Sequence, residues 1–422
     1  MPTLARLCVK GDRLLDKLDR LAKIGRSPNG AICRLAFTPE DLKARYLVQQ
    51  WMMDAGMTVR TDAAGNIIGR YAGQVEGIPA IATGSHIDTV PSGGAFDGAL
   101  GVLAGLEVVA TLHEANLRLN HPVEVIIFAD EEDTMIGSRG MAGTAERSPE
   151  NYVLRSGLSI IDSLDSVGGD WQALPTAQRS RADLAAFVEL HVEQGAVLES
   201  QGTEIGVVQG VVGMLRSAIR ITGQANHAGT TPMDMRQDAL VAAAQIVLSV
   251  QDVALRMPSD PVATVGYLTV APNAVNIVPG QVELSVDIRD LSQVCMEEMQ
   301  AQLERELRAI ATSTHTTIDL TPMLRVPPSP AVAGVQRAIA AACTDLGLSH
   351  CAMPSRAGHD AMEMGRITDM GMIFVPSQEG LSHSGREYTA PEQCIQGANV
   401  LLQTLMRLDS QYPLAVASSS RV

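Results

Sequence analysis

Apolar runs of strand length alternate with helical stretches through the first half of the chain, and this order strongly limits the possible folds. The expected elements are helices at 12–25, 38–56 and 98–115, a hairpin at 57–72, and strands at 79–84, 122–129 and 185–190. Strands that are separated by helices pair in parallel, because a parallel connection needs a long crossover. The sequence therefore predicts an α/β domain built on a mainly parallel sheet.

The order of elements changes after about residue 213. The elements expected there are strands at 216–223, 262–270, 281–289 and 315–322 and helices at 235–255 and 291–312. This βαββαβ order is typical of a small α+β sandwich with its helices on one face. A proline-rich linker at 326–330, a helix at 331–346 and a strand at 371–376 then restore the α/β pattern. We expect one discontinuous domain, 1–213 with 329–422, interrupted by a smaller domain at 214–328.

Two local patterns carry further expectations. Thr38, Pro39 and Asp41 have the spacing of a helix start, in which Thr38 caps the helix and Asp41 completes a capping box. Residues 150–182 are polar and weakly patterned. We expect them to form a long connection on the surface.

The charge balance excludes some classes of partner. The 422 residues include 32 Lys and Arg against 47 Asp and Glu, a net charge of −15, which argues against nucleic acid and against an anionic membrane. No apolar run approaches the ~18 residues of a membrane span, and no signal peptide is recognisable. The six scattered cysteines form no CxxC pair and are expected to be reduced thiols. We therefore expect a cytoplasmic protein.

Histidines and acids follow four of the predicted strands. They are His86, the pair Glu131 and Glu132, His191 and His383. The carboxyl ends of parallel strands meet at one edge of a sheet, where α/β proteins build their sites. A lone histidine is more often structural than a ligand, but imidazoles and carboxylates converging on one edge suit a metal such as zinc. Their joint occurrence favours a metal site.

The acids near this edge have two interpretations. One feature is an acidic triplet, Asp130, Glu131 and Glu132. In most proteins such a triplet is the solvated start of a helix. Adjacent acids at the end of a buried strand repel one another, however, and need a counter-charge, which a metal supplies. Asp97 lies at a helix N-terminus, where it can act as a cap, although the glycine-rich segment before it lets it turn inward. Phosphate-binding loops, dinucleotide fingerprints and nucleophile elbows are absent from the sequence.

Several longer motifs resemble one family. They are TGSHIDTVPSGGAFDGALGVLAGLE (83–107), ELHVEQGAVLE (189–199), QANHAGTTPMDMRQDAL (224–240), NAVNIVPG (273–280), DIRD (287–290), AGHDAM (357–362) and EGLSHS (379–384). Together they resemble the amidase/hydantoinase/carbamoylase family of dinuclear-metal hydrolases, within the aminoacylase and carboxypeptidase superfamily. That family includes N-carbamoyl-L-amino acid amidohydrolases, allantoate amidohydrolases and β-ureidopropionases. The resemblance covers residues from about 83 to 390.

The resemblance implies two divalent metal ions in each subunit. Zinc is expected first, with manganese, cobalt and nickel as alternatives. Asp97 would bridge the two ions. His86 and His191 would complete one site, and Glu132 and His383 would complete the other.

The resemblance also implies the remaining site residues. Glu131 would be the general base toward water between the metals, Asp88 would orient His86 through its carboxylate, and His227 would polarise the scissile carbonyl in the partner subunit's site. The substrate-binding positions would be Gln194, His227, Asn276, Arg289, Gly358 and His359. The guanidinium of Arg289 suits a substrate carboxylate. His359 has two equal interpretations, since it either binds substrate or shapes its loop together with Asp360.

The activity implied is hydrolysis of a linear C–N bond in an N-carbamoyl-L-amino acid, allantoate or a related ureido acid that carries a carboxylate. The 214–328 domain would act as a lid and join two chains into a homodimer. One alternative is an aminoacylase or dipeptidase of the same superfamily, which ELHVEQG argues against. The other is a metal-dependent binding protein without catalysis, which Glu131 argues against. A short 133–137 segment and Arg356 depart from the family pattern, so the substrate stays open.

Overall fold

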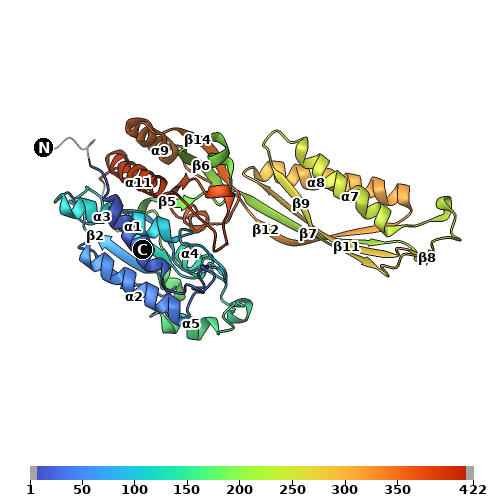
Figure 1. Ribbon diagram of the computed structural model, residues 1–422, viewed down its shortest axis with the longest axis horizontal. Helices are drawn as coiled ribbons and strands as arrows, with labels where there is room; N and C mark the ends of the chain where they lie inside the picture. Colours follow the sequence, from blue (N-terminus) through green and yellow to red (C-terminus); the bar gives the residue numbers. More distant parts are fainter. Residues whose placement is uncertain (1–6, 415–422) are drawn as a thin grey trace, which may run out of the picture. The chain divides into compact units, whose positions relative to one another are not determined.

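The computed structural model describes residues 7–414 of the chain, and they fall into two compact units. The first unit contains the residues up to Gly210 together with those from Pro330 onward, and the second is Val211–Ser329 (Figure 1). The sequence analysis placed these boundaries at 213 and 328. None of the helices within 7–414 is long and apolar enough to cross a membrane, and the cytoplasmic location stays a prediction.

A nine-stranded sheet forms the centre of the first unit, in the order β1-β2-β4-β3-β5-β15-β6-β13, with β14 beside β6. The strands are β1 (Thr58–Thr61), β2 (Ile67–Tyr71), β3 (Ala80–His86), β4 (Val123–Phe128), β5 (Leu184–Val192), β6 (Ile205–Val211), β13 (Ser329–Pro330), β14 (His350–Ser355) and β15 (Asp369–Val375). The central strands β4, β3, β5 and β15 run parallel, whereas β2 pairs antiparallel with β1 and β4, and β6 pairs antiparallel with β15. The predicted mainly parallel sheet is confirmed.

Five of the helices of this unit share the main hydrophobic core with one face of the sheet, namely α1 (Gly11–Ala22), α2 (Pro39–Asp54), α3 (Ala99–Glu114), α9 (Ala333–Leu346) and α11 (Pro391–Gln411). The shorter helices are α4 (Ile136–Ala142), α5 (Ile160–Ser166), α6 (Val197–Gln201) and α10 (Asp360–Met364). Buried side chains line α3 on all sides from Ala99 to Leu112. A Cβ atom at Gly101 would lie 2.3 Å from the carbonyl oxygen of Leu190, so α3 packs closely on β5.

Two local expectations were wrong. Pro39 is the first residue of α2, but Thr38 and Asp41 form no capping box, because Asp41 accepts the N–H of Phe37 at 2.9 Å and the hydroxyl of Thr38 donates to the carbonyl of Leu35. The segment 150–182 is more than a surface connection, since it contains α5 and a small core of its own. The buried members of that core from this segment are Leu154, Ile160, Leu164, Leu174 and Ala177.

The second unit contains a four-stranded antiparallel sheet of order β12-β7-β11-β9. Its elements are β7 (Gly213–Thr222), α7 (Ala239–Leu255), β9 (Val262–Ala271), β11 (Gln281–Asp290), α8 (Gln293–Thr314) and β12 (Thr317–Val326). The predicted βαββαβ order is confirmed, and α7 and α8 lie side by side on one face of the sheet (Figure 1). A short ribbon of β8 (Asn226–His227) and β10 (Ile277–Val278) accompanies the sheet.

Candidate metal centre

Asp97 lies two residues before α3, and the backbone there passes very close to His86. Gly98, the next residue, has φ +64°, and a Cβ atom on it would lie 2.5 Å from the imidazole ring of His86. Only glycine combines this positive φ with so close an approach. The glycine after Asp97 thus lets the carboxylate face the end of the sheet.

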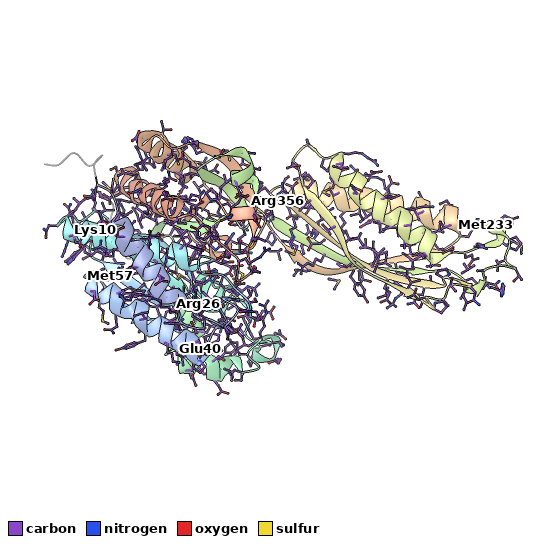
Figure 2. The ribbon with its side chains drawn as sticks, viewed as in Figure 1. Lys10, Arg26, Glu40, Met57, Met233 and Arg356 are labelled. Atoms are coloured by element: carbon purple, nitrogen blue, oxygen red, sulfur yellow. The ribbon has the colours of Figure 1, made fainter. Side chains whose placement is uncertain are left out.

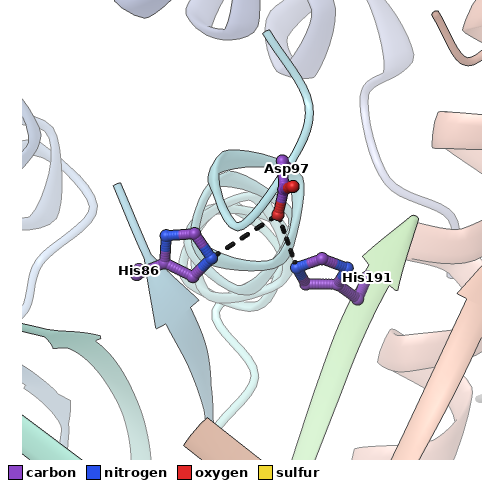
Figure 3. Close-up of side chains that lie close together, drawn as sticks. All are labelled: His86, Asp97 and His191. Carbon is purple, nitrogen blue, oxygen red and sulfur yellow. Dashed lines mark ion pairs between the residues drawn. The ribbon is translucent and has the colours of Figure 1, made fainter. Parts of the chain in front are cut away.

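The first group of potential ligands consists of Asp97 and two histidines from neighbouring parallel strands. His86 is the last residue of β3, and His191 is the penultimate residue of β5. Oδ1 of Asp97 lies 3.6 Å from Nε2 of His86 and 3.1 Å from Nε2 of His191, so the carboxylate stands between the two imidazoles (Figure 3). All three side chains are buried.

Backbone contacts fix which ring nitrogens face Asp97. Nδ1 of His86 donates to the carbonyl oxygen of Asp88 at 3.0 Å, and Nδ1 of His191 donates to the carbonyl of Val192 at 2.8 Å. Each Nε2 atom therefore carries the lone pair that a metal requires. The sequence predicts that the carboxylate of Asp88 orients His86, but it is the backbone carbonyl of Asp88 that accepts the hydrogen bond, and Oδ1 of Asp88 lies 3.7 Å from Nδ1 of His86.

The second group shares Asp97 through its other oxygen. Nε2 of His383 lies 3.4 Å from Oδ2 of Asp97 and 3.5 Å from Oε2 of Glu132. The His383 side chain is 51% exposed, in contrast to His86 and His191. The second group is thus the more open of the two to solvent.

Glu131 lies beside the two groups without belonging to either of them. Its Oε2 atom is 3.7 Å from Nε2 of His86. Burial keeps the pKa of Glu131 well above its usual range, even though the nearby His86 acts to lower it. A largely buried carboxyl thus lies beside the first ligand group.

The histidines and acids of the cluster balance one another electrostatically. Burial alone would raise the pKa of Asp97, but the three imidazoles hold it well below the usual range. Burial alone would lower the pKa of His86, but Glu131 and Asp97 together raise it well above the usual range. The imidazoles and the buried acids thus offset one another, and a divalent cation bound between them would stabilise the acids in the same way.

The donor atoms fit divalent metal ions. Within each group, the three ligand atoms lie within 4.8 Å of one another, and they combine imidazole nitrogen with carboxylate oxygen. A third set, Glu189, His191 and His359, meets the same distance limit. Nε2 of His191 faces Asp97, and Nδ1 donates to the carbonyl of Val192. His191 therefore has no further ring nitrogen with which to bind a metal in this third set.

The predicted substrate-binding residues of the first unit lie in different surroundings. The side-chain amide of Gln194 donates to Oδ2 of Asp97 at 2.9 Å. His359 is 1% exposed, its ring stacks edge-on between His191 and Phe374, and its Nε2 atom has no hydrogen-bond partner. A Cβ atom added at Gly358 would meet open space. Burial favours the loop-shaping interpretation of His359 over direct substrate contact.

The remaining predicted residues belong to the second unit. His227 in β8 pairs with Ile277, next to Asn276, and is exposed. Its Nδ1 atom accepts the N–H groups of Gly229 at 3.1 Å and Thr230 at 3.2 Å, so its hydrogen is on Nε2. Arg289 lies near the end of β11, where Nε of its guanidinium pairs with Asp287 at 2.9 Å.

The sequence analysis missed two polar residues close to the ligands. Ser382 and Glu387 are in hydrogen-bond contact with each other, and both contact Asp97. Ser382 stood inside a quoted motif and directly before His383, which was a usable signal. Glu387 carried none, because an isolated Glu in a polar segment is usually a surface residue.

Comparisons with known proteins point to one family. The sequence pattern of the Peptidase family M20/M25/M40 matches residues 82–407. The N-carbamoyl-L-amino acid amidohydrolase of Geobacillus stearothermophilus is 40% identical over 407 residues, which span 95% of this chain and 99% of the relative. The allantoate amidohydrolase of Bacillus subtilis is 34% identical, and the match spans 96% of this chain and 98% of the relative. The solved structure of a hydantoinase/carbamoylase family amidase from Burkholderia multivorans is similar with a TM-score of 0.88 at 36% identity. The match covers 95% of this chain and 98% of that one.

Proposed function

Because the chain belongs to the Peptidase family M20/M25/M40, we propose that it is a metal-dependent amidohydrolase that cleaves a ureido C–N bond in a small substrate bearing a carboxylate. The relatives are named for N-carbamoyl-L-amino acids and for allantoate, and both kinds of compound contain ureido groups. The structural observation that carries the proposal is the pair of ligand groups that share Asp97, with Glu131 beside them.

The proposed centre holds two divalent metal ions, with zinc as the first candidate. His86 and His191 with one oxygen of Asp97 would hold the first, and Glu132 and His383 with the other oxygen would hold the second. When bound, the ions would supply Lewis-acid activation of water and of the scissile carbonyl.

Glu131 is proposed as the proton carrier of the reaction. It takes a proton from the attacking water, whose oxygen bonds to the carbonyl carbon, and it returns the proton to the nitrogen as the C–N bond breaks. Its place beside His86, outside both ligand groups, leaves its carboxylate available for this work. Attack on a terminal carbamoyl group gives carbamic acid, which decomposes to carbon dioxide and ammonia.

His227 is proposed to stabilise the charge that develops on the carbonyl oxygen. Its Nδ1 atom accepts two backbone N–H groups, so its Nε2–H is directed outward as a donor. One such donor is typically worth about 3–4 kcal/mol in the transition state. Arg289 would pair with the substrate carboxylate, for which its guanidinium has the matching geometry.

The distance between these two residues supports a homodimer. Within the second unit, the β8–β10 ribbon lies beyond the end of the sheet at which β11 begins, while Arg289 lies near the other end of β11 (Figure 1). From Gln281, where β11 begins, to Arg289, the extended strand spans about 27 Å, at ~3.4 Å per residue. A small ureido acid is far too short to contact both residues of one chain. We therefore propose that each site takes Arg289 and His227 from different chains, with the second unit as lid and dimer interface.

The test is ammonia release from a panel of substrates. The metal-stripped protein is reconstituted with zinc, manganese, cobalt or nickel and offered N-carbamoyl-L-amino acids, allantoate, β-ureido acids, N-acyl-L-amino acids and dipeptides. Turnover of a ureido acid, abolished in Glu131→Gln, is the expected result. Turnover of N-acyl-amino acids or dipeptides alone would make the chain an aminoacylase or dipeptidase, and ligand binding without any turnover would make it a binding protein.

A further inference from the structure

Glu387 is a buried carboxylate that touches the metal centre without belonging to either ligand group. Only 6% of the residue is exposed. Its Oε1 atom accepts the backbone N–H groups of Phe96 at 2.9 Å and of Asp97 at 3.0 Å. Its Oε2 atom lies 3.2 Å from the hydroxyl of Ser382, the residue before His383, and the same hydroxyl lies 3.0 Å from Oδ2 of Asp97.

The proposed ligands differ in how the fold holds them. His86 and His191 are part of β3 and β5, whose backbones are fixed by neighbouring strands on both sides. Asp97 and His383 lie outside helices and strands, and His383 has φ +52°. Glu132 lies in a turn as well, so all three ligands in the second group depend on contacts other than strand pairing for their positions.

The segment before Asp97 is built around the Glu387 carboxylate. A Cβ atom at Gly94 would lie 2.2 Å from Oε1 of Glu387, closer than any side chain allows. The absence of a side chain at Gly94 is what lets one oxygen reach two consecutive amides. Hydrogen bonds of a carboxylate to backbone N–H groups are charge-assisted and are about twice as strong as neutral ones.

We propose that Glu387 is a positioning residue that joins the Asp97 segment to the His383 segment, so that its loss selectively weakens the metal site of Asp97, Glu132 and His383. The site of His86 and His191 keeps two ligands that the sheet holds in place. Removing such an outer contact typically costs 10- to 100-fold in metal affinity. The inference rests on the proposed dinuclear centre.

Binding of Zn²⁺ to the full-length, metal-stripped protein tests this, measured by calorimetry and by metal analysis after dialysis against a chelator. Wild type should bind two ions. Glu387→Ala should keep one ion with the smaller loss of affinity, because Asp97 also serves that site, and should bind the other 10- to 100-fold more weakly. Glu387→Gln keeps a carbonyl oxygen for the two amides and should recover most of the lost affinity.

Two further variants complete the design. Glu204→Ala removes a carboxylate that accepts the N–H and hydroxyl of Ser349 in the same way, and it should bind Zn²⁺ like wild type. Gly94→Ala should reproduce the Glu387→Ala defect by displacing the carboxylate, and it carries the test if Glu387→Ala does not fold.

The outcomes separate this inference from the proposed centre. Two wild-type affinities in Glu387→Ala or in Gly94→Ala, or an equal loss at both sites, would overturn the positioning role. A single Zn²⁺ ion bound by wild type would instead overturn the dinuclear centre itself, and the inference with it.

Discussion

Nε2 of His191 lies 3.1 Å from Oδ1 of Asp97, although one residue belongs to a central strand and the other to the segment before a helix. The contact depends on α3 lying almost directly on β5, where Gly101 packs against the backbone of Leu190. The N–H of Gly98 also donates to the same Nε2 atom at 3.1 Å. Small residues in α3 thus decide how closely the shared carboxylate approaches the imidazoles.

Asp97→Ala should lose both metal ions together. The carboxylate offers one oxygen to each ligand group, so its removal leaves each group with two side chains. His383→Ala is the matched control, because His383 belongs to one group only and its loss should release one ion. Metal analysis of the purified variants decides between them, and two retained ions in Asp97→Ala would show that neither site needs Asp97.

Glu131→Gln should keep both metal ions and lose activity. Glutamine has nearly the shape of glutamate but cannot accept the proton of water, and the loss of a general base typically costs ~10²–10⁴-fold in rate. Activity is measured with the best substrate of the panel, and metal content is measured on the same sample. A near-normal rate at full metal occupancy would remove Glu131 from the mechanism.

Mixing inactive variants should show which residues cross between chains. After subunit exchange, Glu131→Gln with His227→Ala should regain activity, because one of the two sites in the mixed dimer contains neither change. Glu131→Gln with Arg289→Ala should stay inactive if Arg289 acts on its own chain's site. Exchange is first shown by mass analysis of tagged chains. Mixed dimers of the first pair that stay inactive, or a monomeric wild type, would refute the arrangement.

Arg13→Met should destabilise the first unit by about 3 kcal/mol. Arg13 forms two hydrogen-bonded contacts with Glu107, at 2.6 and 2.8 Å, and Glu107 is fully buried in α3. The methionine leaves that carboxylate with neutral hydrogen-bond donors, such as the backbone N–H of Lys10, which is labelled in Figure 2. Denaturant unfolding measures the loss. The double variant Arg13→Met, Glu107→Leu should recover most of it, and equal stability of single variant and wild type would contradict the argument.

Asp41→Asn should change the pH dependence of stability. Burial raises the pKa of Asp41 to about 6, against an opposing effect of Arg45. Between about pH 4 and pH 6 the folded state therefore keeps this proton, whereas the unfolded chain has lost it. The stability of the wild type falls as the pH rises through this range, by up to about 3 kcal/mol. Asparagine carries no such proton, so the variant should gain relative to wild type over this range. Unfolding of both metal-free proteins at pH 4.5 and 7 checks this, and parallel profiles would refute it.

The strands and ligands of the centre could be predicted because they follow simple periodic patterns. His86 and His191 each come at the end of a short apolar run, and such runs in an α/β order become parallel strands with a common edge. Even so, both predicted strands ended too early, and the structure places His86 and His191 inside β3 and β5. The ends of strands depend on pairing with neighbours, which a single sequence does not contain.

Other features depend on contacts between distant segments. The sequence alone predicts no strand at β6 or at β14. β6 pairs antiparallel with β15, and β14 pairs with β6 outside the main strand order. Neither pairing follows from the alternation of helices and strands. It also omitted α11, although Pro391 in the first turn and buried residues at 394, 398, 401, 405 and 408 have helical spacing. Asp41 was assigned to its own helix start, but its carboxylate accepts the N–H of Phe37. The pairings of β6 and β14 thus had no local signal, whereas the helical spacing of α11 was a local signal that was overlooked.

The discontinuity of the first unit has a consequence for the order in which the protein is made. A ribosome synthesises His86, Asp97, Glu132 and His191 first, and then the whole of the second unit, before it reaches His383 and Glu387. Domains generally fold as units and in the order in which they emerge. The second unit can therefore fold while the first is still incomplete, and the proposed second metal could be captured only when the chain is nearly finished. Nascent chains that stall before this point would contain four of the five proposed ligands and no complete centre.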